Sequence, residues 1–179
     1  MTTLLKILTA TFVVAATACA TAPKTASERN ELEVKANNTL GEMTARDPGL
    51  HNVLSSSIAY VVLPEIGKAG FVVGGAYGRG VLYEHGTPTG FVRLTQISGG
   101  LQAGAQGLAE LIVINDPHQV AAIKGSKFEL GGNMSAVVLT TGASIAARFV
   151  NGVAVFQMPR GGLMAEAAIA GQQLKFEGG

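Results

Sequence analysis

Residues that could do chemistry are few and scattered along this chain of 179 residues. The one cysteine, Cys19, has no second cysteine to pair with, so the chain has no disulfide framework and this thiol is open to another use. The histidines His51, His85 and His118 are far apart in sequence, and none is followed by another metal-ligand residue three or four positions later, with no second cysteine to help. The sequence therefore predicts neither a metal site nor a cofactor.

Motifs for covalent catalysis and phosphate binding are also missing from the sequence. No Gly-x-Ser-x-Gly occurs, and the glycine-rich run 74–80 neither opens a helix nor contains Lys-Ser/Thr. The acidic residues of the strand-rich part of the chain, from residue 59 onward, are well separated in sequence. The sequence therefore gives no pair of carboxylates that could act together as general acid and base. These acidic residues are Glu65, Glu84, Glu110, Asp116, Glu129, Glu166 and Glu177. We predict that the protein is not an enzyme, and a hydrolase with a site assembled from distant residues is the weaker alternative.

The overall composition is typical of one small, apolar domain. Thirteen basic and twelve acidic residues give a net charge of +1. This balance gives no electrostatic reason to expect nucleic-acid binding, which usually needs a basic stripe. Charged residues make up 14% of the chain, against about 25% in ordinary soluble domains. The 24 glycines lie inside apolar runs without a collagen period, so they call for a structural explanation.

The first 18 residues have the layout of an export signal. Lys6 is followed by an apolar run over residues 7–16, which is too short to span a bilayer of about 30 Å. The small residues Ala16, Thr17 and Ala18 then precede Cys19, as before the lipid-modified cysteine of a lipoprotein. An ordinary cut after Ala20 would instead remove this cysteine. We predict a signal peptide over 1–18, a lipid anchor at Cys19, and export to the periplasm or cell envelope with attachment to a membrane.

The mature chain divides into a short tether and one domain. Residues 19–27 are the predicted tether, residues 28–179 the domain, and Ser27 is the predicted cap of a first helix over 28–46. A second short helix follows Pro48. The first helix has an apolar stripe at helical spacing, formed by Leu32, Ala36, Leu40 and Met43. This stripe could lie in a membrane interface or pack on the rest of the domain, and the scarcity of Lys and Arg favours packing.

From residue 59 onward the sequence is typical of strands separated by turns. The predicted strand segments are 59–63, 69–84 (a strand or hairpin), 91–98, 101–106, 110–115, 127–130, 135–139, 146–158 and 162–176, with a short helix from Asp116 to Ile123. Long helices do not alternate with these strands, which argues against a parallel doubly wound sheet. The predicted fold is α+β, with N-terminal helices packed on a strongly curved, mainly antiparallel sheet or a small β-barrel.

Glycines take alternate positions in the predicted strand region 69–84. Gly70, Gly74, Gly78 and Gly80 share one face, and bulky residues including Tyr77, Val81 and Tyr83 share the other. A bare face lets strands bend and lets backbones approach closely. The alternative is that this face makes room for an acyl chain.

Four segments of the chain resemble the SYLF domain, also called the Ysc84 actin-binding domain. They are residues 59–75, 78–82, 99–106 with Gly-Gly-Leu-Gln-Ala-Gly-Ala-Gln, and 161–172. The similarity extends over roughly residues 30–176 and implies lipid binding, as in eukaryotic relatives that bind phosphoinositides at actin-rich membranes. Bacterial relatives are typically exported proteins, often lipoproteins, and an exported chain is not expected to meet actin. The tryptophan that the family often has near the middle is absent.

If the domain binds anionic lipid, cations must contact the headgroup, at about 1 kcal/mol each near a charged surface. Lys68, Arg79 and Arg93 lie in or beside the resembling segments and are the predicted headgroup residues, and the alternative is that they are ordinary solvated charges. We therefore expect a non-enzymatic, membrane-tethered protein that binds phospholipid or another anionic lipid. A structural or scaffold protein of the envelope that binds a protein partner is the alternative.

Overall fold

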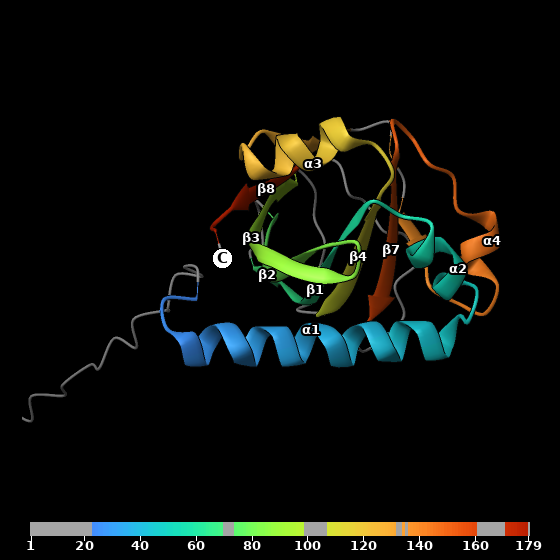
Figure 1. Cartoon of the computed structure of the whole chain (residues 1–179), viewed down its shortest axis with the longest axis horizontal. Coiled ribbons are helices and arrows are strands. Elements are labelled where there is room, and N and C mark those ends of the chain that lie inside the picture. The colour runs from blue at the N-terminus through green and yellow to red at the C-terminus, as the bar shows by residue number, and fades with distance from the viewer. Residues whose placement is uncertain are drawn as a thin grey trace, which may run out of the picture.

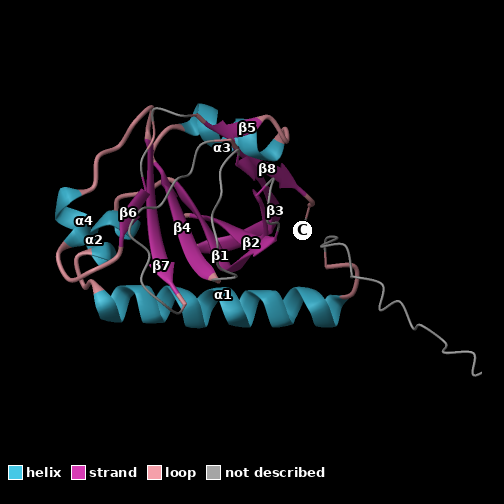
Figure 2. Ribbon diagram, turned by 180° about the vertical axis from the view of Figure 1, so that it is seen from behind, coloured by secondary structure: helices cyan, strands magenta, loops and turns pink. Residues whose placement is uncertain are grey.

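The computed structural model describes residues 23–69, 74–98, 107–131, 134, 136–160 and 171–178. These residues form an α+β fold in which the sheet curls strongly into a half-barrel. One long helix lies along the outer side of the sheet and a shorter helix covers its opposite side, near one end (Figure 1). Figure 2 shows the same layers from behind. The predicted fold class is confirmed.

The helices are α1 (Ala26–Arg46), α2 (Leu50–Ser55), α3 (Pro117–Lys124) and α4 (Ala143–Ala146). The strands are β1 (Ala59–Ala69), β2 (Gly74–Glu84), β3 (Thr87–Ser98), β4 (Leu108–Ile114), β5 (Phe128–Leu130), β6 (Ala136–Val138), β7 (Val153–Pro159) and β8 (Gln172–Phe176).

The described strands form one sheet in the order β5-β8-β3-β2-β1-β4-β7-β6. All neighbouring strands pair antiparallel except β6 and β7, which are parallel. The segments 70–73, 99–106 and 161–170 lie outside the described residues, so the predicted strand 101–106 and the first part of the predicted strand 162–176 have no structural counterpart to compare.

Helix α1 begins with a reciprocal cap at Thr25. The Thr25 side chain accepts a hydrogen bond from the backbone N–H of Glu28 at 3.2 Å, and the Glu28 carboxylate accepts from the backbone N–H of Thr25 at 3.2 Å. This capping box satisfies two N–H groups that a helix start leaves unpaired. The prediction that Ser27 caps the helix is wrong, because the helix already begins at Ala26.

The apolar stripe of α1 packs against the outer face of the sheet. Leu32, Ala36 and Met43 are buried there, in a cluster with side chains of β1–β4 and β7. The Tyr83 hydroxyl donates to the Asn37 side chain at 2.9 Å, and the Tyr83 ring stacks on the Tyr60 ring. The apolar stripe is therefore used in packing on the sheet, as the sequence favoured, and is not available to a membrane.

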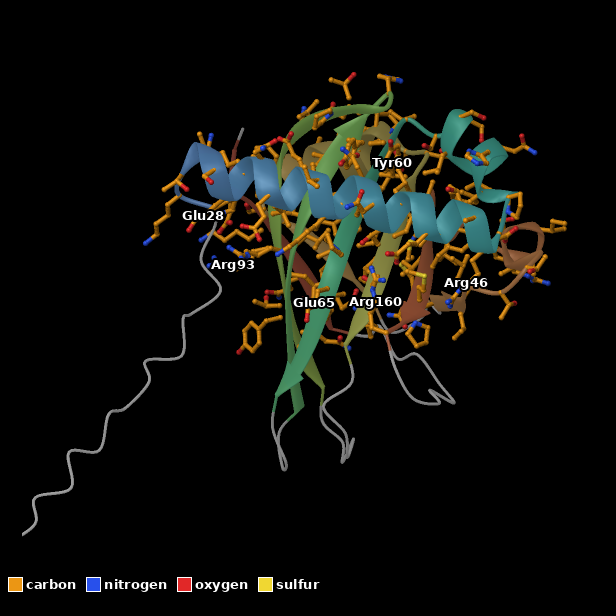
Figure 3. The ribbon with its side chains drawn as sticks, turned by 90° about the horizontal axis from the view of Figure 1, so that it is seen from below. Glu28, Arg46, Tyr60, Glu65, Arg93 and Arg160 are labelled. Carbon is orange, nitrogen blue, oxygen red and sulfur yellow. The ribbon has the colours of Figure 1, made fainter. Side chains whose placement is uncertain are left out.

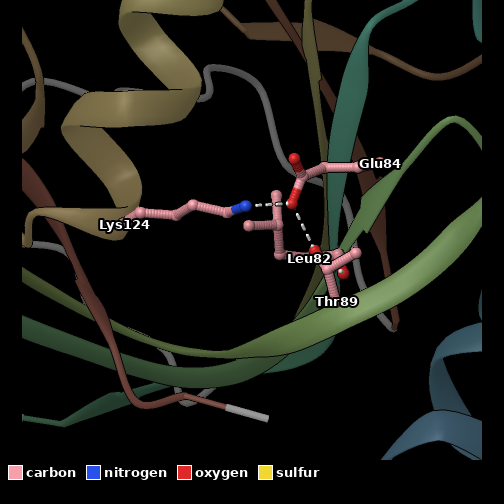
Figure 4. Close-up of polar contacts among 4 residues, drawn as sticks. All are labelled: Leu82, Glu84, Thr89 and Lys124. Carbon is pink, nitrogen blue, oxygen red and sulfur yellow. Dashed lines mark hydrogen bonds and ion pairs between the residues drawn. The ribbon is translucent and has the colours of Figure 1, made fainter.

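The inner face of the half-barrel carries a second apolar cluster. It joins side chains of the strands with Val120 and Ile123 of α3. Asp116 caps α3 by accepting from the His118 N–H at 2.8 Å, and Lys124 at its end lies 2.6 Å from the Glu84 carboxylate (Figure 4). The charged hydrogen bond from Lys124, with a second from the Thr89 hydroxyl, lowers the pKa of Glu84. These contacts fix α3 over the inner face of the sheet. The sheet therefore has a helix on each face, α1 outside and α3 inside.

Glycines of β2 permit the close approach of β1. A Cβ atom on Gly80 would lie 2.5 Å from the backbone oxygen of Val62, and one on Gly78 would lie 2.9 Å from the Ile66 side chain. Real Cβ atoms do not come this close to other atoms, so only glycine fits this curled stretch of β1 and β2. At these two positions the structural explanation of the glycine face is confirmed.

The predicted strand over 146–158 is correct only from Val153. Residues Ala143–Ala146 instead form α4, after Gly142 with a left-handed φ of 81°. Asn151 and Gly152 then form a tight turn with φ of 50° and 75°, closed by hydrogen bonds between Val150 and Val153. Asn-Gly is the typical sequence of such a turn, so the sequence contained a signal for this break.

Candidate functional site

Two of the three predicted headgroup cations lie side by side on the sheet. Arg79 of β2 is directly opposite Arg93 of β3, and Glu65 of β1 is opposite Arg79 on its other side. The Lys68 backbone pairs with Ala76, and its side chain lies outside the described part of the chain. The strand pairing thus brings Arg79 and Arg93 together.

An open groove of about 370 Å³ runs between α1 and the strand pair β1–β2. Apolar parts of its wall come from Leu32, Pro64 and Tyr77, and the Tyr77 ring is 52% exposed. Arg79 contributes a positive charge to this wall, and Arg93 lies nearby on the same side of α1 as Glu65 (Figure 3). The groove therefore coincides with part of the predicted headgroup site.

The groove has mixed charge. Its lining includes the cations Lys35 and Arg79 and the carboxylates Glu28, Glu31 and Glu65. Outside the groove, Arg93 lies 3.6 Å from a fourth carboxylate, that of Glu177. The sequence prediction named only the cations, since the carboxylates of α1 join the site through helix packing and not through sequence proximity.

Hydrogen bonds lower the pKa of two carboxylates of α1, those of Glu28 and Glu31. Backbone N–H groups of Lys24 and Thr25 lower the pKa of Glu28, and the nearby charge of Arg79 lowers it further. The pKa of Glu31 is lowered by its hydrogen bond to Lys35, with an N–O distance of 2.6 Å, and again by Arg79. At neutral pH the groove thus presents both signs of charge within reach of one bound molecule.

The family comparison places this chain among known domains. Residues 95–177 match the family model Ysc84, described as "Las17-binding protein actin regulator". This part of the chain belongs to the Ysc84 family. The match includes the resembling segments 99–106 and 161–172, whereas 59–75 and 78–82 lie before it. No curated protein matches the chain.

Within the Ysc84 region, a polar cluster lies inside the half-barrel. Glu110 of β4 is fully buried and accepts hydrogen bonds from the Gln157 amide at 2.5 Å and the Gln172 amide at 3.2 Å. The Gln172 amide is also 3.4 Å from the Gln96 side-chain oxygen. One wall of the half-barrel contributes Glu110 and Gln157, and the other contributes Gln96 and Gln172. The cluster therefore ties the two walls together.

The remaining site predictions can be placed only in part. Cys19 lies outside the described residues. Among the residues that the structure describes, no three His, Cys, Asp or Glu side chains gather as a metal site would require. In the same part of the chain, no helix is long and apolar enough to cross a membrane.

Proposed function

We propose that this Ysc84-domain protein binds phospholipid at a membrane of the cell envelope, without catalysing a reaction. The observation that carries the proposal is the groove beside α1, because Arg79 lines it. Arg79 is one of the cations that the sequence alone predicted to contact a lipid headgroup. The family resemblance, with its implication of lipid binding, supports the same reading.

The charge of the groove favours a headgroup that carries both a phosphate and an ammonium group. Arg79 and Lys35 can meet the phosphate, and Glu65 or Glu31 the ammonium. The exposed Tyr77 ring adds a face that attracts an ammonium group. The side chains of Lys35 and Glu31 are both more than half exposed, so their ion pair contributes little to stability and a headgroup can replace it. A zwitterionic phospholipid fits this groove better than a purely anionic one.

The three predicted headgroup cations, of which Arg79 lines the groove, can be removed together. The variant Lys68→Ala/Arg79→Ala/Arg93→Ala is expected to carry at least tenfold less phospholipid after purification than the unmodified protein, since each cation contributes about 1 kcal/mol. The bound lipid is measured by extraction and phosphorus assay. The control is Lys127→Ala, which removes an exposed cation that follows α3. Equal lipid in the folded triple variant would reject this site.

Membrane attachment through Cys19 is a separate part of the proposal. The mature protein is expected to begin at Cys19 and to carry a thioether-linked diacylglycerol, because small residues precede this cysteine as they do in lipoproteins. The intact mass of the denatured protein measures this directly. A mature chain that begins at Thr21 with no acyl group would exclude the anchor.

Binding of a protein partner is the second candidate function. It is favoured by the family description, which names a protein partner, Las17. Actin regulation is not carried over, since the predicted export signal would separate the protein from actin. A purified protein with a stable protein partner and no phospholipid would favour this second candidate.

A further inference from the structure

The segment around α4 leaves two large apolar side chains in solvent. Ile145 is 89% exposed and Phe149 is 39% exposed. The described residues include only two other large hydrophobic side chains this exposed, Val34 and Tyr77, and they lie on other elements. Neighbouring exposed apolar side chains are typical of a surface that meets another molecule or a membrane.

The structure holds this segment firmly in place. Ala143 and Ser144 of α4 are buried, and the Ser144 N–H donates to the Asp47 carboxylate at 2.6 Å. The Thr141 hydroxyl donates to the Arg46 backbone oxygen at 3.2 Å. With its other side buried, α4 cannot turn Ile145 inward without breaking these contacts. The exposure of Ile145 thus follows from the packing of α4.

The segment that carries Ile145 and Phe149 has basic charge only. Arg148 and Arg46 are both exposed, and the segments 48–58 and 136–153 contain no Asp or Glu. The nearby Asp47 is buried. Burial alone would raise the pKa of Asp47, but hydrogen bonds from Ser144 and Gly49 outweigh it and lower the pKa. Asp47 thus acts within the fold, and the surface itself combines apolar and cationic groups, as interfacial membrane contacts do.

The position of this surface complements the predicted tether. The tether joins the domain at the start of α1, whereas α4 lies near the other end of α1 (Figure 1). A helix of 21 residues is about 31 Å long. A tether alone would let the domain rotate, and a second contact this far away would fix which side faces the bilayer.

We propose that the α4 patch, defined as Arg46, Ile145, Arg148 and Phe149, inserts into the interfacial layer of an anionic bilayer. The two apolar side chains enter the headgroup region and the arginines contact lipid phosphates. This inference rests on the proposed function only in that the protein works at a membrane, and it does not depend on the groove.

The first test measures binding to vesicles in the full chain with Cys19→Ser, so that no acyl anchor contributes. Vesicles contain equal parts of phosphatidylcholine and phosphatidylglycerol. Ile145→Ser/Phe149→Ser is expected to weaken co-sedimentation at least tenfold, at low and at high salt. Arg148→Ala is expected to weaken it about fivefold at low salt only, because salt screens exposed charges. Val34→Ser removes an exposed apolar side chain from α1 and is expected to have no effect.

A second measurement reports insertion at the residue itself. The chain has no tryptophan, so Ile145→Trp gives fluorescence from this site alone. Its emission is expected to shift to the blue with these vesicles and to be quenched by lipids brominated in the acyl chains. Val34→Trp is expected to show neither change, since it stands among the polar residues Asn30, Glu31 and Asn38 at helical spacing.

Each outcome decides for or against the patch. Unshifted Ile145→Trp emission with vesicle-bound protein would overturn the proposal, as would unchanged binding of Ile145→Ser/Phe149→Ser. Either result, in a protein that still purifies with phospholipid, would leave the groove and the proposed function standing. Loss of groove-bound lipid in the triple cation variant, with vesicle binding retained, would support the patch as a separate contact.

Discussion

Glu110→Ala is expected to lower the free energy of unfolding by about 3 to 4 kcal/mol. The carboxylate of Glu110 accepts hydrogen bonds from the buried amides of Gln157 and Gln172, which come from opposite walls of the half-barrel. Its removal takes this acceptor from the Gln157 amide and leaves the Gln172 amide only the more distant Gln96 oxygen, at about 1 to 3 kcal/mol for a buried group that loses its partner, and adds a cavity. Urea unfolding measures the loss.

The matched variant Glu110→Gln keeps the shape and one acceptor oxygen. It is expected to cost less than half as much as Glu110→Ala, because an amide oxygen can still accept from one of the glutamine amides. An unfolding midpoint of Glu110→Ala equal to that of the unmodified protein would contradict the view that this cluster joins the two walls.

Gly80→Ala is expected to lower the free energy of unfolding by about 2 to 3 kcal/mol. The added Cβ atom would lie 2.5 Å from the Val62 backbone oxygen and 3.0 Å from the Leu63 side chain. Backbone cannot move aside as a flexible side chain can, so β1 and β2 must separate or flatten. Thermal or urea unfolding measures the loss.

Gly41→Ala is the control for this substitution. Gly41 lies in α1, and a Cβ atom there would meet nothing within 4 Å. Alanine favours a helix over glycine by about 0.5 to 1 kcal/mol, so this variant is expected to be more stable than the unmodified protein. If both variants were equally stable, close approach at Gly80 would not be what requires glycine.

Local patterns in the sequence predicted much of the fold. The apolar spacing of Leu32, Ala36 and Met43 predicted the face of α1 that packs on the sheet. The alternation around Gly78 and Gly80 predicted a bare strand face, and Asp116-Pro117 predicted the start of α3. These signals depend on neighbours within a few residues, which is why they could be interpreted without knowing the rest of the structure.

Features that depend on long-range pairing could not be predicted. A bulge in β1 between Val62 and Glu65 changes which residues face inward, so Leu63 and Ile66 both enter the inner cluster. The curl of the sheet brings Gln172 to Glu110 from the far wall. Sequence spacing showed Glu110 only as an isolated acid, because its partners are distant glutamines.

The sequence named only some of the residues of the candidate site. The cations Arg79 and Arg93 lie in or beside the resembling segments, and their pairing on neighbouring strands brings them together. The groove and its carboxylates arise from the packing of α1 across β1 and β2, which no local pattern reports. The α4 patch arises from a helix of four residues, shorter than a helical period can reveal.

Lipid extracted from the purified, unmodified protein tests the central claim most directly. The groove beside α1 predicts phospholipid bound to the folded protein, with zwitterionic headgroups enriched over their share of the source membrane. Native mass spectrometry of the same sample should show the protein with phospholipid masses attached. Folded protein that carries no phospholipid, and gains none when phospholipid is supplied, would contradict the proposal.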